Sequence, residues 1–334
     1  MNKKHDTPAL RPWQRLVGIL HYERSTINYI FLYAIFIGLL GLTLPLGTTA
    51  IFNLLSNGSM YSSTYILIAV VLIGILVGGL LLIGQFTLVE LVEQKIFARA
   101  ALEFAYRLPR VKKSELVGEH PPELVNRFFD ILTIQKGLTK LLVEIVSAAV
   151  LIFFSAILLS FYHPVYMAFG IFIVLVLALV LALYYKDAVK TSIKESSHKY
   201  QMVAYLEEVA GSLDEYRGNR DKMKEAMEMT DEITSKYLKS RTNHFRVLRK
   251  FFASSIIIRA ILMGALLLMG SYFVIDRQMT FGQFVAAEVI IVQISYAVEK
   301  LMANMNTVFD MVTGAEKLAV FTDLELIGEE EKNG

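Results

Sequence analysis

Long apolar stretches that alternate with strongly charged segments are the feature that most constrains the fold of this chain. Each stretch holds about 20 residues or more, the length that an α-helix needs to cross a hydrocarbon core roughly 30 Å thick. Six such stretches can be read: Tyr29–Ala50, Tyr65–Val89, Leu141–Phe161, Val165–Tyr185, Phe251–Ile275 and Phe281–Met302. Hydrophobic residues make up 55% of the chain. We therefore expect an all-α membrane protein with six transmembrane helices.

The connections between these stretches alternate between very short and very long. The short ones are Asn53–Ser63, the His163-Pro164 turn and Asp276–Thr280. Pro164 disfavours helix at His163, so Leu141–Tyr185 should divide there into a tight hairpin. The long connections span about 91–140 and 186–250. Together with the segment before the first stretch they hold 28 of the 33 Lys and Arg residues. The positive-inside rule then places both termini and both long loops in the cytoplasm.

Each long loop reads as a helical hairpin that extends the membrane helices into the cytoplasm. Arms of 20–30 residues would reach roughly 30–45 Å below the bilayer at about 1.5 Å per residue. The first loop breaks at Pro109 and the second near Gly211 and Gly218. Stalks of this length serve no purpose in binding a small solute, and they indicate contact with something in the cytoplasm.

The two ends of the chain divide it into three parts. Residues 1–28 form a cytoplasmic N-terminus. Within it, 11–24 has the pattern of a short amphipathic helix lying in the membrane interface, with Trp13, Leu16, Val17 and Leu20 on one face. Residues 29–322 form the six-helix domain, in which the last helix leaves the membrane and ends near Thr322. Residues 323–334 form an acidic tail, which we expect to lack packed structure from Leu326 onward.

The sequence lacks the patterns of several other functions. The net charge of +2 gives no electrostatic support for nucleic-acid binding, and the chain contains no Cys. No G-x-x-x-x-G-K-[ST] loop, G-x-S-x-G elbow or paired His motif occurs. We therefore expect no catalytic residue, no metal site and no cofactor in this chain.

Three local stretches, in the right order along the span-and-loop plan, resemble the transmembrane domain of ABC exporters of the six-helix type. The first covers 106–130, where the family has a short coupling helix followed by a Gly-Glu-Leu-x-x-Arg-x-x-x-Asp-like segment. The second, 205–226, resembles the family's second coupling loop, and the third, 279–293, its Leu-Thr-x-Gly-x-x-Val-Ala pattern. The matching residues are Glu123, Leu124, Arg127, Thr280, Gly282, Val285 and Ala286. Asp130 comes one position early, Gly118 is displaced, and the Pro common midway along the last span is absent.

The resemblance implies a membrane subunit of an ATP-driven exporter that lacks its own nucleotide-binding domain. The implied partners are a separate ATP-binding subunit carrying ATP and Mg, a second copy or homologous transmembrane subunit, and the lipid bilayer. The implied location is a bacterial inner membrane. The residues expected to contact the ATPase are Arg110, Lys112, Lys113 and Glu115 in the first loop and Asp214, Glu215, Tyr216 and Arg217 in the second.

Polar residues inside the apolar stretches are expensive in lipid and are candidates for function. Arg259 and Glu299 lie at nearly matching depths on adjacent antiparallel spans, which predicts an ion pair; the alternative is that each reaches the interface separately. Glu288 and Gln293 are candidates for the translocation pathway. Gln85, Gln283 and Gln293 are more typical of hydrogen bonds between helices.

Two other classes of protein also fit the sequence. An ion-coupled secondary transporter would need broken helices and midplane carboxylates, for which Gly78-Gly79 and Glu288 offer weak candidates. A non-transporting scaffold or sensor could use the same stalks to bind a soluble partner. The substrate, the choice between homodimer and heterodimer, and the possibility that the chain is a fragment of a longer protein stay open.

Overall fold

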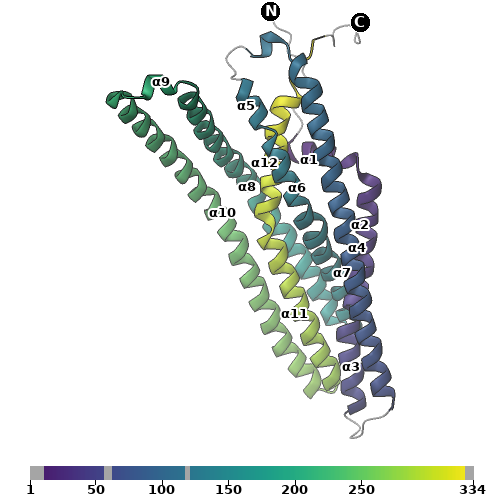
Figure 1. Ribbon diagram of the computed structural model, residues 1–334. Coiled ribbons are helices and arrows are strands. Elements are labelled where there is room, and N and C mark those ends of the chain that lie inside the picture. The colour runs from purple at the N-terminus through teal and green to yellow at the C-terminus, as the bar shows by residue number, and fades with distance from the viewer. Residues whose placement is uncertain (1–10, 56–61, 117–120, 328–334) are drawn as a thin grey trace, which may run out of the picture.

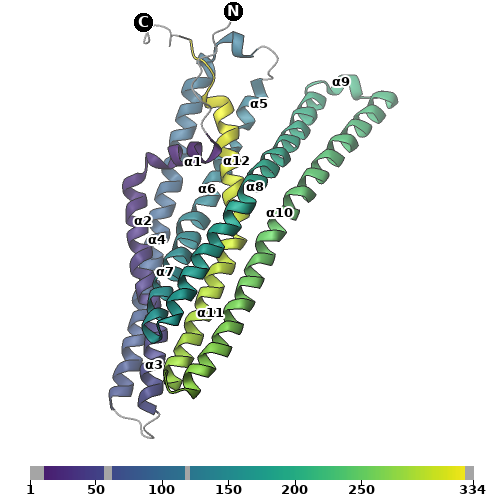
Figure 2. The same ribbon diagram turned by 180° about the vertical axis from the view of Figure 1, so that it is seen from behind.

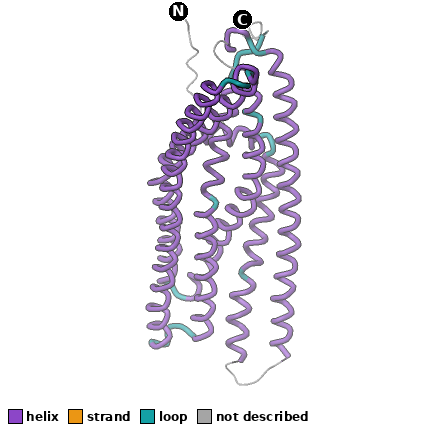
Figure 3. Tube along the Cα trace, turned by 60° about the vertical axis from the view of Figure 1, so that its left-hand side comes forward, coloured by secondary structure: helices purple, strands orange, loops and turns teal. Residues whose placement is uncertain are grey.

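The computed structural model describes residues 11–55, 62–116 and 121–327, and within them the chain is almost entirely helical (Figures 1, 2 and 3). Six helical segments of this part are long and apolar enough to span a membrane: Arg24–Leu55, Ser62–Arg110, Leu124–Tyr162, Val165–Gly211, Arg220–Ile275 and Phe281–Thr322. Each contains one of the six predicted stretches. The predicted all-α fold with six membrane-spanning helices is therefore confirmed.

The elements follow one another as long helices with short irregular joints. In chain order they are α1 Pro12–His21, α2 Arg24–Gly41, α3 Thr43–Leu55, α4 Ser62–Arg107, the 3-10 turns η1 Leu108–Arg110 and η2 Lys113–Leu116, α5 Pro121–Asn126, α6 Phe129–Thr139, the π-helical turn η3 Lys140–Ile145, α7 Val146–Tyr162, α8 Val165–Gly211, α9 Leu213–Tyr216, α10 Arg220–Ile275, α11 Phe281–Ala303 and α12 Met305–Thr322.

Two of the six spanning segments are interrupted in the structure. The first crossing breaks at Leu42, between α2 and α3, because Pro45 has no N–H to donate to the carbonyl of Gly41 one turn earlier. The last crossing breaks at Asn304, whose side-chain amide donates to the Lys300 carbonyl and to Glu144, at 2.9 Å in each case. Both interruptions depend on a single side chain, and the apolar pattern around them gives no sign of either.

The predicted hairpin at Pro164 is present. α7 ends at Tyr162, His163 adopts an extended backbone with φ of −157°, and α8 begins at Val165. The His163 ring stacks on Phe273 at 3.9 Å between centroids, which ties this turn to the nearby connection between α10 and α11. The short connections therefore gather at one end of the molecule, here called the short-loop end.

Both long loops form stalks at the opposite end, here called the stalk end. The hairpin of α8 and α10, capped by α9, diverges from the rest of the bundle toward this end (Figures 1 and 2). The other stalk consists of the ends of α4 and α12 with α5 and α6. Both views place the N- and C-terminal sides of the chain beside this second stalk.

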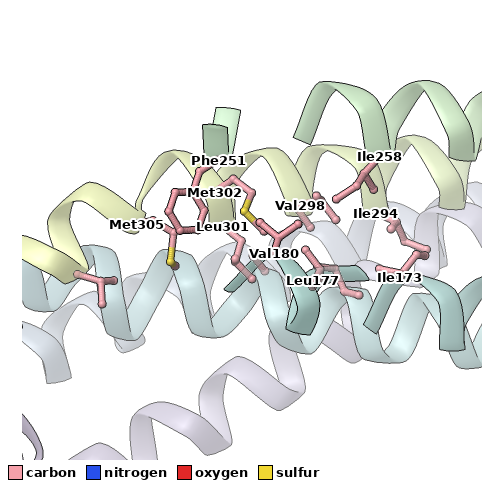
Figure 4. Packing of buried hydrophobic residues seen from close by; sticks show 14 of the residues in the cluster. Ile173, Leu177, Val180, Phe251, Ile258, Ile294, Val298, Leu301, Met302 and Met305 are labelled. Atoms are coloured by element: carbon pink, nitrogen blue, oxygen red, sulfur yellow. The ribbon is translucent and has the colours of Figure 1, made fainter. Parts of the chain in front are cut away.

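Buried aliphatic and aromatic side chains form two hydrophobic clusters. The larger one runs along the membrane part and joins α8, α10 and α11 through residues such as Leu177, Ile258 and Val298 (Figure 4). The smaller one lies at the stalk end and includes Phe104 and Phe321, whose rings stack at 4.1 Å between centroids. Because the second cluster joins α4 to α12, this stalk has a core of its own.

The N-terminal helix and the tail differ in part from the expected pattern. The expected apolar face of α1 is divided: Leu16 is fully buried, whereas Trp13 is 41% and Val17 44% exposed. The tail remains ordered beyond residue 322, because Leu326 is 4% exposed and belongs to the smaller cluster. Leu326 alone packs against the stalk, because Ile327 is 63% exposed. The expectation that packed structure is lacking from Leu326 onward is therefore wrong at Leu326.

Candidate functional site

The tip of the α8–α10 hairpin presents the second predicted set of contact residues. Ser212 and Gly218 flank the short helix α9, and Gly218 takes a φ of +76°, the left-handed conformation that glycine adopts without strain. The side chain of Asn219 then accepts a hydrogen bond of 3.1 Å from the Lys222 backbone N–H and caps α10. The turn chemistry therefore closes the hairpin tightly and points α9 away from the bundle.

The charges on this tip face solvent. The side chain of Asp214 is 97% exposed and that of Arg217 is 72% exposed, and the two lie 3.4 Å apart. Glu215 pairs with Lys222, and the hydrogen bond from this ammonium lowers the pKa of the Glu215 carboxyl. Leu213, on the same helix, is 47% exposed. The tip thus combines mixed charges with one exposed apolar side chain, a surface suited to binding another protein.

The tip of the first stalk is partly covered by the chain itself. Lys112 lies 2.9 Å from the Glu325 carboxylate, and its backbone N–H donates to the Glu325 carbonyl at 3.0 Å. Val111 and Leu326 form an isolated antiparallel bridge. The segment after α12 therefore covers part of Lys112, and the predicted contact of Lys112 with an ATPase stays a prediction.

The other predicted contact residues of the first tip differ in how far they are exposed to solvent. Arg110 donates to the Tyr106 carbonyl at 2.7 Å and lies over the Tyr106 ring at 4.1 Å, so it packs back on α4. Lys113 is exposed. The side chain of Glu115 lies outside the described part of the chain. The two sets of predicted contact residues share the stalk end but are well separated within one chain (Figures 1 and 2).

A buried polar cluster, here called the stalk joint, lies between the tips and the membrane part. It consists of Arg127, Asp130 and Tyr200. The Tyr200 hydroxyl donates to the Asp130 carboxylate, and the Arg127 guanidinium lies 4.0 Å from the centre of the Tyr200 ring. Arg127 is 8% and Asp130 4% exposed. In the sequence, Arg127 fits the family pattern and Asp130 departs from it by one position. Their spacing of three within a predicted helix was the available signal that they lie close together, although Arg127 in fact lies in the joint between α5 and α6.

A polar cavity of about 250 Å³ adjoins the stalk joint, between α6, α8, α10 and α12. Arg241 and Glu195 face it and form an ion pair of 2.7 Å. Burial raises the pKa of Asp310 to about 6, and the nearby Glu195 charge adds to the rise. Burial also raises the pKa of Asp130, against the lowering effect of the Tyr200 hydrogen bond. The stalks are therefore packed through ionisable groups that sequence reasoning did not single out.

The predicted intramembrane ion pair is present. The Arg259 guanidinium lies 3.4 Å from the Glu299 carboxylate and 5.1 Å from the centre of the Tyr296 ring. Both charged side chains are about half exposed, at 46% and 54%. In a membrane part, such exposure means contact with lipid, with a water-filled pathway or with another subunit.

The remaining polar candidates in the membrane part differ in their hydrogen bonds and burial. Gln85 is fully buried and joins helices as predicted, because its amide lies 3.3 Å from the Leu142 carbonyl. Gln283 instead caps α11 with Thr280, so its predicted role between helices is wrong. Gln293 lines an apolar cavity of about 330 Å³ between α2, α7 and α11, and its buried Oε1 has no hydrogen-bond partner in the described part. Glu288 is half-buried.

No group of three or more His, Cys, Asp or Glu side chains within the described residues could hold a metal ion. The features that stand out are mechanical: two stalk tips, a buried joint and continuous helices into the membrane.

The family model for the ABC transporter transmembrane region matches residues 27–298 of this chain. The match covers most of the 334 residues, and the chain belongs to this family. It is therefore the membrane-spanning part of an ABC-type transporter, and it is integral to the membrane with several crossings. No curated protein matches the chain.

Proposed function

We propose that this chain works as a dimeric membrane subunit of an exporter and is driven by ATP hydrolysis on a separate ATP-binding subunit. The observation that carries the proposal is the pair of stalk tips at one end of the molecule, of which α9 exposes Leu213, Asp214 and Glu215 to solvent. The chain has no phosphate-binding loop, so ATP and Mg would be held by the partner. The stalk end would then face the cytoplasm of a bacterial inner membrane, with both termini on that side.

The long helices give the coupling a mechanical basis. α8 has 47 residues and α10 has 56. At about 1.5 Å per residue they are roughly 70 and 84 Å long. A displacement imposed on α9 is carried along both helices into the membrane part without an intervening loop. Closure of the ATPase pair would push the tips, and the bundle would change from inward-open to outward-open.

The divergent hairpin supports the dimer. Toward the stalk end, α8 and α10 lean away from the other stalk, so that α9 lies to the side of the rest of the bundle (Figures 1 and 2). A second copy, or a homologous subunit, would cover the faces that this divergence leaves open. In the membrane part, the half-exposed Arg259–Glu299 pair would then line the pathway between the two subunits.

Affinity purification of the tagged chain in mild detergent, followed by mass spectrometry, tests the proposal. We expect a stoichiometric ATP-binding protein to co-elute. Reversing the charges of Asp214 and Arg217 should release it, because both are exposed and lie at the α9 tip. Lys239→Glu is the matched control, since Lys239 is exposed on the shaft of α10 away from the tip.

The alternatives predict different results. A clean dimer without any ATP-binding protein, combined with transport that follows an ion gradient, would replace the proposal with a secondary transporter. Co-elution of a different soluble partner through the same tip residues, without ATP-dependent transport, would assign the chain to the scaffold class. Substitutions at Lys112 are less informative than those on α9, because they also disturb the segment after α12.

A further inference from the structure

A groove between α8 and α10 carries a concentration of positive charge that the proposed function does not use. The groove has a volume of about 340 Å³. Four cationic side chains line it, namely Lys190 and Lys194 from α8 and Arg246 and Lys250 from α10, against a single carboxylate from Asp187. This set is here called the basic groove.

The arrangement of these cations is unfavourable without a counter-charge. On each helix the two cations are four residues apart, a spacing at which like charges repel. In the described part of the chain none of the four forms an ion pair, although Arg246 donates to the Asn243 side chain at 3.1 Å. All four are exposed. With four cations and one carboxylate, the groove therefore presents a net positive charge to whatever lies in front of it.

The level of the groove along the helices identifies the neighbouring medium. The apolar span of α8 ends at Tyr185 and that of α10 begins at Phe251. Lys250 lies 5.3 Å from the centre of the Tyr184 ring, so the two helices leave the apolar layer at the same level. Lys190 lies five residues beyond Tyr185, and Arg246 five residues before Phe251. Each is therefore about 7.5 Å along the helix axis from the end of its apolar span, on the stalk side. The polar headgroup layer is roughly 5–7.5 Å thick on each side of a bilayer, so Lys190 and Arg246 lie near its outer edge.

The rest of the groove suits a ligand with a polar head and an apolar body. Thr191 and Ser240 also line the groove, but their hydroxyls are hydrogen-bonded within the protein, so the cations carry the polar part of the site. Val247, 8% exposed, closes the floor. On the membrane side of the groove the surfaces of both helices are apolar, and Leu183 of α8 is 59% exposed there. A soluble phosphate would use only the head-binding part, whereas a phospholipid would use both.

We propose that the basic groove binds the phosphate-bearing headgroup of an anionic phospholipid in the leaflet nearest the stalks. Basic pockets between membrane helices recognise anionic headgroups through the sum of their charges, and each cation near the surface contributes about fivefold in affinity. The lipid neutralises the repulsion between the four cations, so it joins α8 to α10 at the base of the hairpin. The lipid site depends only on this chain and the membrane, so its test does not require the ATP-binding partner.

The test measures lipid binding to the purified chain in detergent micelles by native mass spectrometry. The probes are phosphatidylglycerol and phosphatidylcholine with identical acyl chains, and glycerol phosphate as the soluble headgroup. We expect phosphatidylglycerol to bind at least tenfold more tightly than phosphatidylcholine. We expect glycerol phosphate to bind too weakly to compete at the same concentration.

A triple variant with Gln at Lys190, Arg246 and Lys250 should lose about 100-fold in affinity for phosphatidylglycerol. The matched control carries Gln at Arg220, Lys224 and Lys239, three exposed cations farther along the same hairpin. It has the same net charge and should stay within about threefold of the unaltered chain. Lys194→Gln should lose less than Lys190→Gln, because Lys194 lies four residues farther from the membrane. These single substitutions keep the test valid if the triple variant fails to fold.

Three results would overturn the proposal. Equal losses in the triple variant and the control would mean that net charge, not the groove, attracts the lipid. Equal affinity for glycerol phosphate would make the groove a site for soluble phosphate. Dissociation of a dimer by the triple variant, without any change in lipid binding, would assign the groove to a partner subunit.

Discussion

Removing one hydroxyl group from the stalk joint should loosen the first stalk in a pH-dependent way. Tyr200→Phe deletes the group that donates to the Asp130 carboxylate and changes little else in the side chain's shape. Asp130 is 4% exposed to bulk solvent, so a water that replaced the lost donor would have to come from the neighbouring polar cavity, where it would be held at a cost. A buried acceptor that loses its partner costs about 1–3 kcal/mol. We take about 2 kcal/mol as the expected loss.

The pH dependence follows from the charge state of Asp130. The Tyr200 hydrogen bond lowers the pKa of this carboxyl, which burial otherwise raises. Without the hydroxyl, the pKa of Asp130 in the folded chain rises further, and the variant takes up a proton more readily. The penalty is therefore largest at high pH, where Asp130 must stay charged, and it shrinks as the pH falls and the carboxyl becomes neutral.

Hydrogen exchange of the α6 amides, Phe129–Thr139, measures this loss locally. About 2 kcal/mol corresponds to roughly 30-fold faster exchange in Tyr200→Phe than in the unaltered chain at pH 8, with a ratio that shrinks as the pH is lowered. Tyr205→Phe is the matched control, because the Tyr205 hydroxyl has only a long contact of 3.5 Å with the Ala226 carbonyl. A ratio below about threefold at pH 8, or one equal to the control, would refute the reasoning.

Three further predictions concern packing and charge. In a double-mutant cycle of unfolding free energies, Arg259→Ala and Glu299→Ala should couple by about 0.6 kcal/mol, typical of polar contacts between membrane helices, and strict additivity would contradict the pair. Because the pKa of Asp310 is raised to about 6, the folded chain holds a proton that the unfolded chain releases above about pH 4. The stability of the folded chain therefore falls as the pH rises from about 4 to 6, where Asp310 must lose its proton. Asp310→Asn should raise the free energy of unfolding at pH 7 by at most about 3 kcal/mol. This gain should disappear in thermal melts below pH 4. Gly137→Ala places a methyl group 2.3 Å from a buried methionine of α12 and should cost about 1–3 kcal/mol, whereas Gly79→Ala meets open space and should not lower the melting temperature.

The membrane architecture was predictable because it depends on long-range averages. Apolar length and the distribution of Lys and Arg fix the number of spans and the positions of the stalks, and single residues hardly affect either. The hairpin at Pro164 was also predictable, since a missing N–H has a local and direct effect. Pro45 carries the same local signal for the break at Leu42, but it was overlooked inside an apolar stretch read as one helix. The break at Asn304 involves a contact of its side chain with Glu144, 160 positions away, which no local pattern shows.

The candidate site was predictable only in part, because its residues meet through tertiary packing. Arg259 and Glu299 could be matched because they lie at similar depths on spans that follow one another in the chain. These two spans also lie side by side in the structure, so the pair forms. The contact between Lys112 and Glu325 joins residues more than 200 positions apart, and neither local sequence predicts it. Tyr200 entered no prediction, because a tyrosine in a charged helix carries no signal until its neighbour Asp130 is known.

The contacts at the stalk end divide the chain into two bodies. Arg15 of α1 bonds Asp323 at 2.7 Å, and Lys112 bonds Glu325 at 2.9 Å, so the N-terminal helix, the first tip and the segment after α12 are fastened together. The smaller hydrophobic cluster lies wholly within this body. The α8–α10 hairpin meets it through the stalk joint and the neighbouring cavity, where the contacts are polar and in part ionisable. A partner that bound both tips would therefore act on the separation between the two bodies. The buried charges between them, rather than the aliphatic core in the membrane, would set how easily that separation changes.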